Sequence, residues 1–228
     1  FVAQKDAFMK NDLAELNIIA ASQWKRPIYF TSPFISLGLN DYLQTDGLTY
    51  RLVPVRKEDT SGMLQTGNTN LSQMYDNLMT KFAFGGAEKP GTYFDEPNRR
   101  ELLTLRSAYM QLSIGLSNAG RKDSALKVLR YADDHILESN FPYGLTSPQN
   151  LNDYTAAQVV YAYYLAGDST RAGEIADKII TDCNQQIAFY TSLGSRFSAD
   201  LAQDQKNATY IIGQLQQMKQ HFSMLQHQ

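Results

Sequence analysis

The chain has 228 residues, of which 43% are hydrophobic and 19% are charged, a composition typical of a folded globular protein and not of a disordered one. Its 21 basic and 23 acidic residues give a net charge of −2, which argues against DNA or RNA as a partner. The single cysteine, Cys183, excludes an internal disulfide, and no run of about 18 apolar residues predicts a membrane-spanning helix.

A helix and two short strands are predicted in the first part of the chain. Residues 11–23 place leucine and isoleucine on one helical face, and Pro27 prevents that helix from continuing. The β-branched and aromatic run at residues 28–31 is typical of a strand. A second such run at residues 48–55 follows a turn at residues 46–47. We therefore expect a small α/β subdomain with two strands.

A polar stretch separates this subdomain from the rest of the chain. Residues 58–69 are rich in Asp, Thr, Ser, Gly and Asn and have no apolar periodicity, which is typical of a connection. We place the boundary there, with the α/β subdomain at residues 1–66 and a helical domain at residues 67–228. The first helix of that domain is expected over residues 71–82.

A repeated pattern predicts two helical hairpins in the helical domain. The first hairpin opens with Asp95 as its N-cap and turns at Gly120. Gly120 and Gly167 each follow an apolar helical stripe, and an alanine, Ala125 or Ala172, stands five residues after each glycine. Such small side chains allow two helices to approach closely. The pattern resembles the tetratricopeptide repeat.

An insertion and a terminal helix complete the expected fold. The two turn glycines are farther apart than the repeat length of about 34 residues, so we expect residues 140–148 to loop out. A last apolar stripe over residues 201–225 predicts a long amphipathic helix that covers the final hairpin. The expected fold class is mainly α, with a small N-terminal α/β cap, tetratricopeptide-like helical hairpins and a C-terminal capping helix.

The sequence offers no pattern for catalysis or for a cofactor. It contains no zinc-protease, P-loop, nucleophile-elbow or dinucleotide motif. His135, His221 and His227 are too widely spaced to predict a metal site. Cys183 lies in an apolar helical pattern and is interpreted as an inert thiol. We expect no catalytic residue, no cofactor and no metal in this chain.

The adjacent acidic residues Asp133 and Asp134 do not indicate a catalytic site. Neighbouring side chains on a helix diverge by about 100°, so the carboxylates of Asp133 and Asp134 cannot share one substrate proton. We interpret this pair as an exposed, solvated helix face.

Aromatic side chains are the most unusual part of the composition, with 14 tyrosines, 11 phenylalanines and one tryptophan. Such rings can stack on a sugar or bind a peptide, but in helical hairpins they also fill the core. Both interpretations remain open for the aromatic residues of the helical domain. The candidate binding surface consists of Tyr93, Phe94, Tyr143, Tyr161 and Tyr164.

Several ordered runs of residues resemble one bacterial family. These runs are KNDL at 10–13, WKRPIYF at 24–30, GLTYRLVP at 47–54, MYDNL at 74–78 and GTYFD at 91–95. They are similar to the soluble C-terminal region of large multi-pass membrane proteins of unknown function, whose membrane part is similar to protein O-mannosyltransferases. The resemblance implies a position on the periplasmic face of the inner membrane, tethered through an upstream membrane region. Within it, we interpret Trp24, Arg26 and Pro27 as structural, with Trp24 packed under the sheet.

The resulting functional hypothesis is a noncatalytic interaction domain of a larger membrane protein. The chain begins at Phe1 without an initiator methionine, so we expect it to be a piece of a longer protein. The hairpins favour binding of a protein partner, or of the protein's own membrane domain, through a shallow apolar groove. The alternative is a part of a membrane glycosyltransferase that holds an acceptor or a sugar through exposed rings lining one cleft. A third possibility is a structural tail without a ligand.

Overall fold

The chain is mainly helical, as the sequence predicts. A computed structural model describes residues 7–32, 37–56, 69–194 and 198–226. The chain divides into two compact units, Phe1–Phe82 and Ala83–Gln228, which we call the N-terminal unit and the helical unit. The expected boundary between residues 66 and 67 falls outside the described residues. Among the helices that the structure describes, none combines the length and the apolar content that a bilayer crossing requires.

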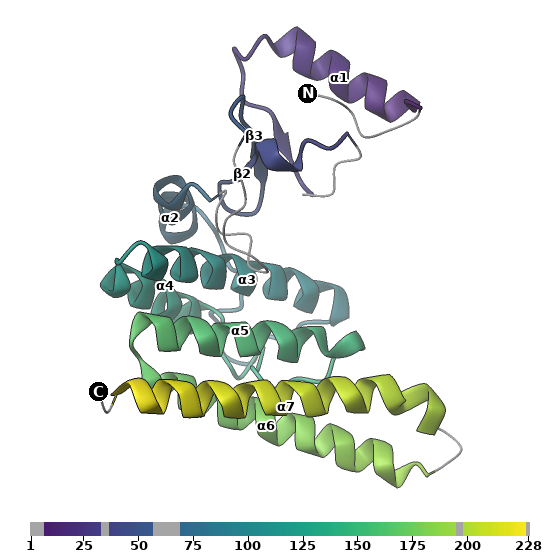
Figure 1. Ribbon diagram of the computed structural model, residues 1–228, viewed down its shortest axis with the longest axis vertical. Coiled ribbons are helices and arrows are strands. Elements are labelled where there is room, and N and C mark those ends of the chain that lie inside the picture. Colours follow the sequence, from purple (N-terminus) through teal and green to yellow (C-terminus); the bar gives the residue numbers. More distant parts are fainter. Residues whose placement is uncertain (1–6, 33–36, 57–68, 195–197, 227–228) are drawn as a thin grey trace. The chain divides into compact units, whose positions relative to one another are not determined.

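The described part of the N-terminal unit contains a small antiparallel sheet and two helices (Figure 1). Its elements are α1 (Lys10–Ser22), β1 (Tyr29–Phe30), a 3₁₀ turn (Asn40–Tyr42), β2 (Leu43–Thr45), β3 (Tyr50–Leu52) and α2 (Leu71–Thr80). β3 is the central strand and pairs with both β1 and β2. The sequence predicts only two of the three strands. It misses β2 because Gln44 and Thr45 do not continue an apolar alternation, and the strand is defined by its pairing with β3.

Leucine side chains from β2, from β3 and from the segment between β1 and β2 form the core of the N-terminal unit. Partly buried side chains of α1 and of the strands pack around them. The buried members of this core are Leu37, Leu39, Leu43 and Leu52. α2 is tied to the sheet, because the Asn77 side-chain amide donates a hydrogen bond to the Asp46 carbonyl oxygen and the Asn70 backbone N–H donates to that of Thr45.

The helical unit contains two helical hairpins and a covering helix (Figure 1). Its long helices are α3 (Glu96–Asn118), α4 (Lys122–His135), α5 (Leu151–Ala166), α6 (Ser169–Ser192) and α7 (Ser198–Gln226). α3 packs against α4 and α5 against α6, and α5 also contacts α3, α4 and α7. This central position explains why most of the α5 residues are buried, since a helix covered on several sides is apolar nearly all round.

Glycine occupies the turn of each hairpin, and alanine occupies the contact between its two helices. Gly120 and Gly167 have left-handed backbone conformations in the turns, with φ of +75° and +93°, which glycine adopts without steric cost. Ala125 and Ala172 are fully buried. Larger side chains at these two positions would force the helices of each hairpin apart.

α7 is the expected covering helix at the end of the chain. It packs against α6 and α5, and its Ala208, Ile211 and Leu215 side chains are fully buried. Phe222 stacks on Tyr164 of α5, with ring centroids 4.5 Å apart. The apolar stripe predicted over residues 201–225 therefore faces the hairpin along most of its length, and Leu225 near its end is exposed.

Gly144 stands where the connection between α4 and α5 passes close to α6. A Cβ atom at this position would lie 2.7 Å from the Lys178 carbonyl oxygen and 2.9 Å from the Asp182 Cβ. Because a helix backbone cannot move aside as a flexible side chain can, we expect Gly144→Ala to lower the free energy of unfolding by about 1–3 kcal/mol. Gly173→Ala is the matched control, since a Cβ there meets no atom within 4 Å. Urea denaturation of both variants tests this, and equal stability of the two would contradict the close approach.

Candidate functional site

The described residues contain no cluster of three or more His, Cys, Asp or Glu side chains that could hold a metal ion. The His135 ring stacks on Tyr131, with centroids 4.1 Å apart, and its Nδ1 lies within hydrogen-bond distance of the Tyr131 carbonyl oxygen. Burial, together with Asp153 and Asp182, raises the pKa of Cys183 to about 12. The Cys183 thiol is therefore protonated at neutral pH and is a poor nucleophile.

Three of the candidate aromatic residues differ strongly in exposure. Tyr93 is 80% exposed, and the Arg99 guanidinium lies over its ring, 5.8 Å from the centroid. Phe94 and Tyr143 are buried. A ligand could reach the face of Tyr93, whereas the other two rings are covered.

The remaining two candidate aromatic residues pack against the covering helix. Tyr164 is buried and stacks on Phe222, and Tyr161 is partly buried and meets the same ring edge-on, with centroids 6.2 Å apart. The structure thus places Tyr161 and Tyr164 together at the contact between α5 and α7. It does not assemble the five candidate rings into one exposed surface.

Trp24 lies at the rim of a hollow in the N-terminal unit and is not packed under the sheet as the sequence suggests. Its side chain is 51% exposed and lines an apolar hollow of about 280 Å³ that also includes Leu16 and Leu52. The chain passes through left-handed conformations at Gln23 and Trp24 directly after α1. Arg26 and Pro27 are exposed.

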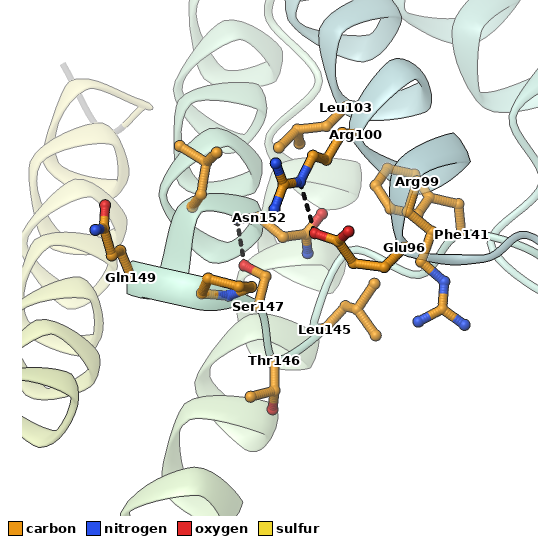
Figure 2. A pocket seen from close by; sticks show the side chains of 12 residues that line it. Glu96, Arg99, Arg100, Leu103, Phe141, Leu145, Thr146, Ser147, Gln149 and Asn152 are labelled. Carbon is orange, nitrogen blue, oxygen red and sulfur yellow. Dashed lines mark hydrogen bonds and ion pairs between the residues drawn. The ribbon is translucent and has the colours of Figure 1, made fainter. Parts of the chain in front are cut away.

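A pocket opens between the start of α3 and the connection that leads into α5 (Figure 2). Its volume of about 340 Å³ is in the range of small ligand sites. α3 contributes Glu96, Arg99, Arg100 and Leu103. The other lining residues are Phe141, Leu145, Thr146, Ser147, Pro148, Gln149, Leu151 and Asn152. We call this site the Arg99 pocket.

The lining of the Arg99 pocket includes two basic side chains and one acidic side chain. Glu96 and Arg100 form an ion pair at 2.6 Å, drawn as a dashed line in Figure 2. Arg99 has no carboxylate partner within the described part of the chain, and its guanidinium lies over the Tyr93 ring. Considering the described residues alone, the pocket therefore offers one cation without a carboxylate partner beside the apolar side chains of Leu103 and Leu145.

A buried arginine holds one wall of the pocket in place. Arg106 of α3 is 3% exposed, and its Nη2 donates a hydrogen bond to the Phe141 carbonyl oxygen at 2.6 Å. The guanidinium carbon lies 4.3 Å from the ring centroids of both Phe141 and Tyr143. Burial lowers the pKa of Arg106. Carbonyl oxygens and ring faces stabilise this buried cation, which ties the connection to α3.

Asp133 joins the same connection to α4, α5 and α6. Its carboxylate accepts hydrogen bonds from the Tyr143 hydroxyl, from the Tyr163 hydroxyl at 2.9 Å and from Arg171 at 2.7 Å. Burial, followed by the Asp133 charge, raises the pKa of Tyr163, so its hydroxyl remains a donor. The interpretation of Asp133 as an exposed residue is wrong, because the connection folds back over α4 and leaves this side chain 18% exposed. Asp134, the next residue, is exposed.

Asp153 anchors the connection from the side of α5. It is fully buried, and its Oδ1 accepts a hydrogen bond from the Leu145 backbone N–H at 3.2 Å while its Oδ2 accepts one from the Gln186 amide at 2.8 Å. Burial raises the pKa of Asp153 to about 6, although these two hydrogen bonds act in the opposite direction. The neighbouring Asn152 side chain donates a hydrogen bond to the Tyr143 carbonyl oxygen. Leu145 is therefore fixed at the pocket by groups that are themselves buried.

The backbone at the edge of the pocket has an uncommon shape. Gln149 and Asn150 both have left-handed conformations, with φ of +57° and +53°, which cost about 1–3 kcal/mol each for residues other than glycine. Asn150 is held by hydrogen bonds from its backbone N–H to the Ser147 carbonyl oxygen and from its side chain to Gln186. Surrounding contacts thus determine this shape, a situation common at binding sites.

The sequence reasoning misses the α3 residues of the pocket. Arg99 and Arg100 stand close to the N-terminus of α3, where the helix dipole disfavours cations. Two adjacent arginines at such a position are a signal that could have indicated a binding role. The contribution of Leu145 and Leu151 depends on how the connection folds back, which residue patterns do not show.

Comparison with known proteins reaches only the first part of the chain. Residues 1–73 match a family model described as TMEM260-associated domain 2. No curated protein and no solved structure matches the chain. The match includes the runs at 24–30 and 47–54 and is consistent with a domain associated with a membrane protein family, while the Arg99 pocket lies outside the matched residues.

Proposed function

We propose that this chain is a noncatalytic interaction domain of a larger membrane protein, and that it binds a protein partner or the protein's own membrane domain through the Arg99 pocket. The observation that carries the proposal is an open pocket of about 340 Å³ whose wall is fixed by buried groups. Such a preformed wall reduces the cost of ordering the site when a ligand binds.

A sugar-holding role has less support from the same geometry. Carbohydrate binding would need exposed rings that line one cleft. Among the residues that line the Arg99 pocket, Phe141 is the one aromatic residue, and it is 1% exposed. Tyr93 is exposed but is not a lining residue. The apolar and cationic lining fits a polypeptide better.

The cellular setting and the repeat class are parts of the same proposal. The resemblance of the N-terminal runs and the match to a TMEM260-associated domain support a parent with a membrane part. We place the chain on the periplasmic face of the inner membrane, beside a membrane part similar to protein O-mannosyltransferases. The left-handed turn glycines and the buried alanines support a tetratricopeptide-like nature of the two hairpins.

Site-specific photo-crosslinking in the full-length parent, in its native membranes, tests the proposed function. A photoreactive phenylalanine analogue replaces Leu151, which is 55% exposed in the pocket, or Met224, which is 62% exposed on α7 as a control. We expect a defined polypeptide adduct, or a link to the membrane domain, from position 151 alone. Adducts with lipid or glycan only, identical adducts from both positions, or no adduct at all would contradict the proposal.

A further inference from the structure

We propose that the ligand of the Arg99 pocket is an extended polypeptide segment in which an acidic and an aliphatic side chain stand two residues apart. This inference rests on the function proposed above. The acidic side chain of the ligand forms an ion pair with Arg99, and its aliphatic side chain contacts Leu145 and Leu151. The ligand backbone forms hydrogen bonds with the Thr146 backbone.

The charge of the pocket selects an acidic group. Glu96 and Arg100 neutralise one another at 2.6 Å. Arg99 is partly buried and has no carboxylate partner among the described residues. Its planar guanidinium can form two parallel hydrogen bonds with one carboxylate. An uncompensated arginine in a mainly apolar pocket therefore favours Asp or Glu over a neutral side chain.

The apolar part of the pocket selects an aliphatic neighbour. Leu151 is 55% exposed although it begins a helix that is otherwise mostly buried. It lies in the same lining as Leu103 and Leu145. Figure 2 shows the Leu145 and Arg99 side chains on the same side of the pocket. Covering such side chains with an aliphatic group removes apolar surface from water.

The backbone of the connection favours a polypeptide over a small molecule. Residues 145–147 belong to no helix or strand, and Ser147 is extended, with φ of −145° and ψ of 161°. The Leu145 N–H bonds inward to Asp153, and the Ser147 carbonyl accepts from Asn150. Thr146 is exposed, and its own N–H and C=O make no backbone hydrogen bond within the described residues. An extended segment could pair with both groups, as in strand addition.

The spacing of the two side chains follows from strand geometry. In an extended segment, alternate side chains point to the same face, with about 3.3 Å between successive residues. An acidic and an aliphatic side chain that both face the pocket must therefore be two positions apart. Strand geometry allows either order of the two side chains, so both orders are tested.

Methyl NMR of the 228-residue chain tests this ligand chemistry directly. The probes are acetyl-Ser-Glu-Thr-Leu-Ser-amide and acetyl-Ser-Leu-Thr-Glu-Ser-amide, with control peptides that carry Gln for Glu or place Glu and Leu side by side. We expect at least one probe to shift the methyl signals of Leu103, Leu145 and Leu151. Its Gln counterpart should bind about tenfold more weakly, and the adjacent arrangement should also bind more weakly.

Variants identify the cation. Arg99→Gln should remove the preference for Glu over Gln while leaving the urea midpoint nearly unchanged, because this side chain makes no ion pair or side-chain hydrogen bond among the described residues. Arg121→Gln changes an exposed arginine in the turn between α3 and α4 and should keep the preference. Equal binding of the Glu and Gln peptides, or no shift with any probe, would overturn the inference. A defined crosslink from position 151 in the absence of peptide binding would leave the proposed function standing and refute this ligand chemistry alone.

Discussion

Replacing Asp133 with alanine is expected to lower the free energy of unfolding by about 3–5 kcal/mol. The change removes the carboxylate that accepts hydrogen bonds from Tyr143, Tyr163 and Arg171. Both tyrosines are buried, so each hydroxyl would be left without an acceptor, which costs about 1–3 kcal/mol per group. Urea denaturation followed by circular dichroism measures the loss.

The adjacent residue provides the control for this variant. Asp134 is exposed and lies on the same helix, so Asp134→Ala should change the unfolding free energy by less than about 0.5 kcal/mol. Asp133→Asn keeps one acceptor oxygen and should fall between the wild type and Asp133→Ala. If Asp133→Ala and Asp134→Ala cost the same, the hydrogen bonds at Asp133 do not contribute as described.

Replacing Asp153 with asparagine is expected to remove a pH dependence of about 3 kcal/mol from the stability of the chain. The native pKa of Asp153 is raised to about 6, mainly by burial, from its ordinary value of 3.8. The native state therefore binds the proton more tightly than the unfolded state does. The stabilisation is fully present below about pH 4 and is lost as the pH rises through about 6. The pKa difference of about two between the native and the unfolded state corresponds to about 3 kcal/mol.

Urea denaturation at several pH values between 4 and 7 measures this effect. Relative to the wild type, Asp153→Asn should gain about 3 kcal/mol of stability between pH 4 and pH 7, because the neutral amide has no charge to bury. Asp134→Asn removes an exposed carboxylate from the same unit and controls for the loss of one negative charge. A constant difference between wild type and Asp153→Asn over this pH range would show that burial does not hold the proton on Asp153.

Local patterns were sufficient to predict most of the helices, because their apolar residues recur at helical spacing and because α2, α3 and α6 begin at residues whose side chains cap them. Asp95 accepts a hydrogen bond from the Asn98 backbone N–H at the start of α3, as its position before Pro97 suggests. Contacts between distant segments were not predictable in this way. Arg106 stands among the apolar residues of α3 and gives no signal that Phe141 and Tyr143, more than thirty positions later, bury it.

The candidate site shows the same limit more strongly. The sequence suggests Tyr143 as a binding residue because of its aromatic ring, but its hydroxyl donates a hydrogen bond to Asp133 and its ring lies beside Arg106. The residues that line the Arg99 pocket meet only when the connection between α4 and α5 folds back onto α3. Composition and periodicity describe one segment at a time, so they cannot indicate a pocket whose walls come from two segments.

The order of the helices in the helical unit has a consequence for how the chain reaches its native state. α3 packs on α4, α5 on α6 and α6 on α7, so each helix finds a partner that was synthesised directly before or after it. Contacts between neighbours in sequence require only short loops to close, and such low contact order is associated with folding in microseconds to milliseconds. The helical unit can therefore assemble progressively during translation, from α3 onward, with α7 as the last segment to dock.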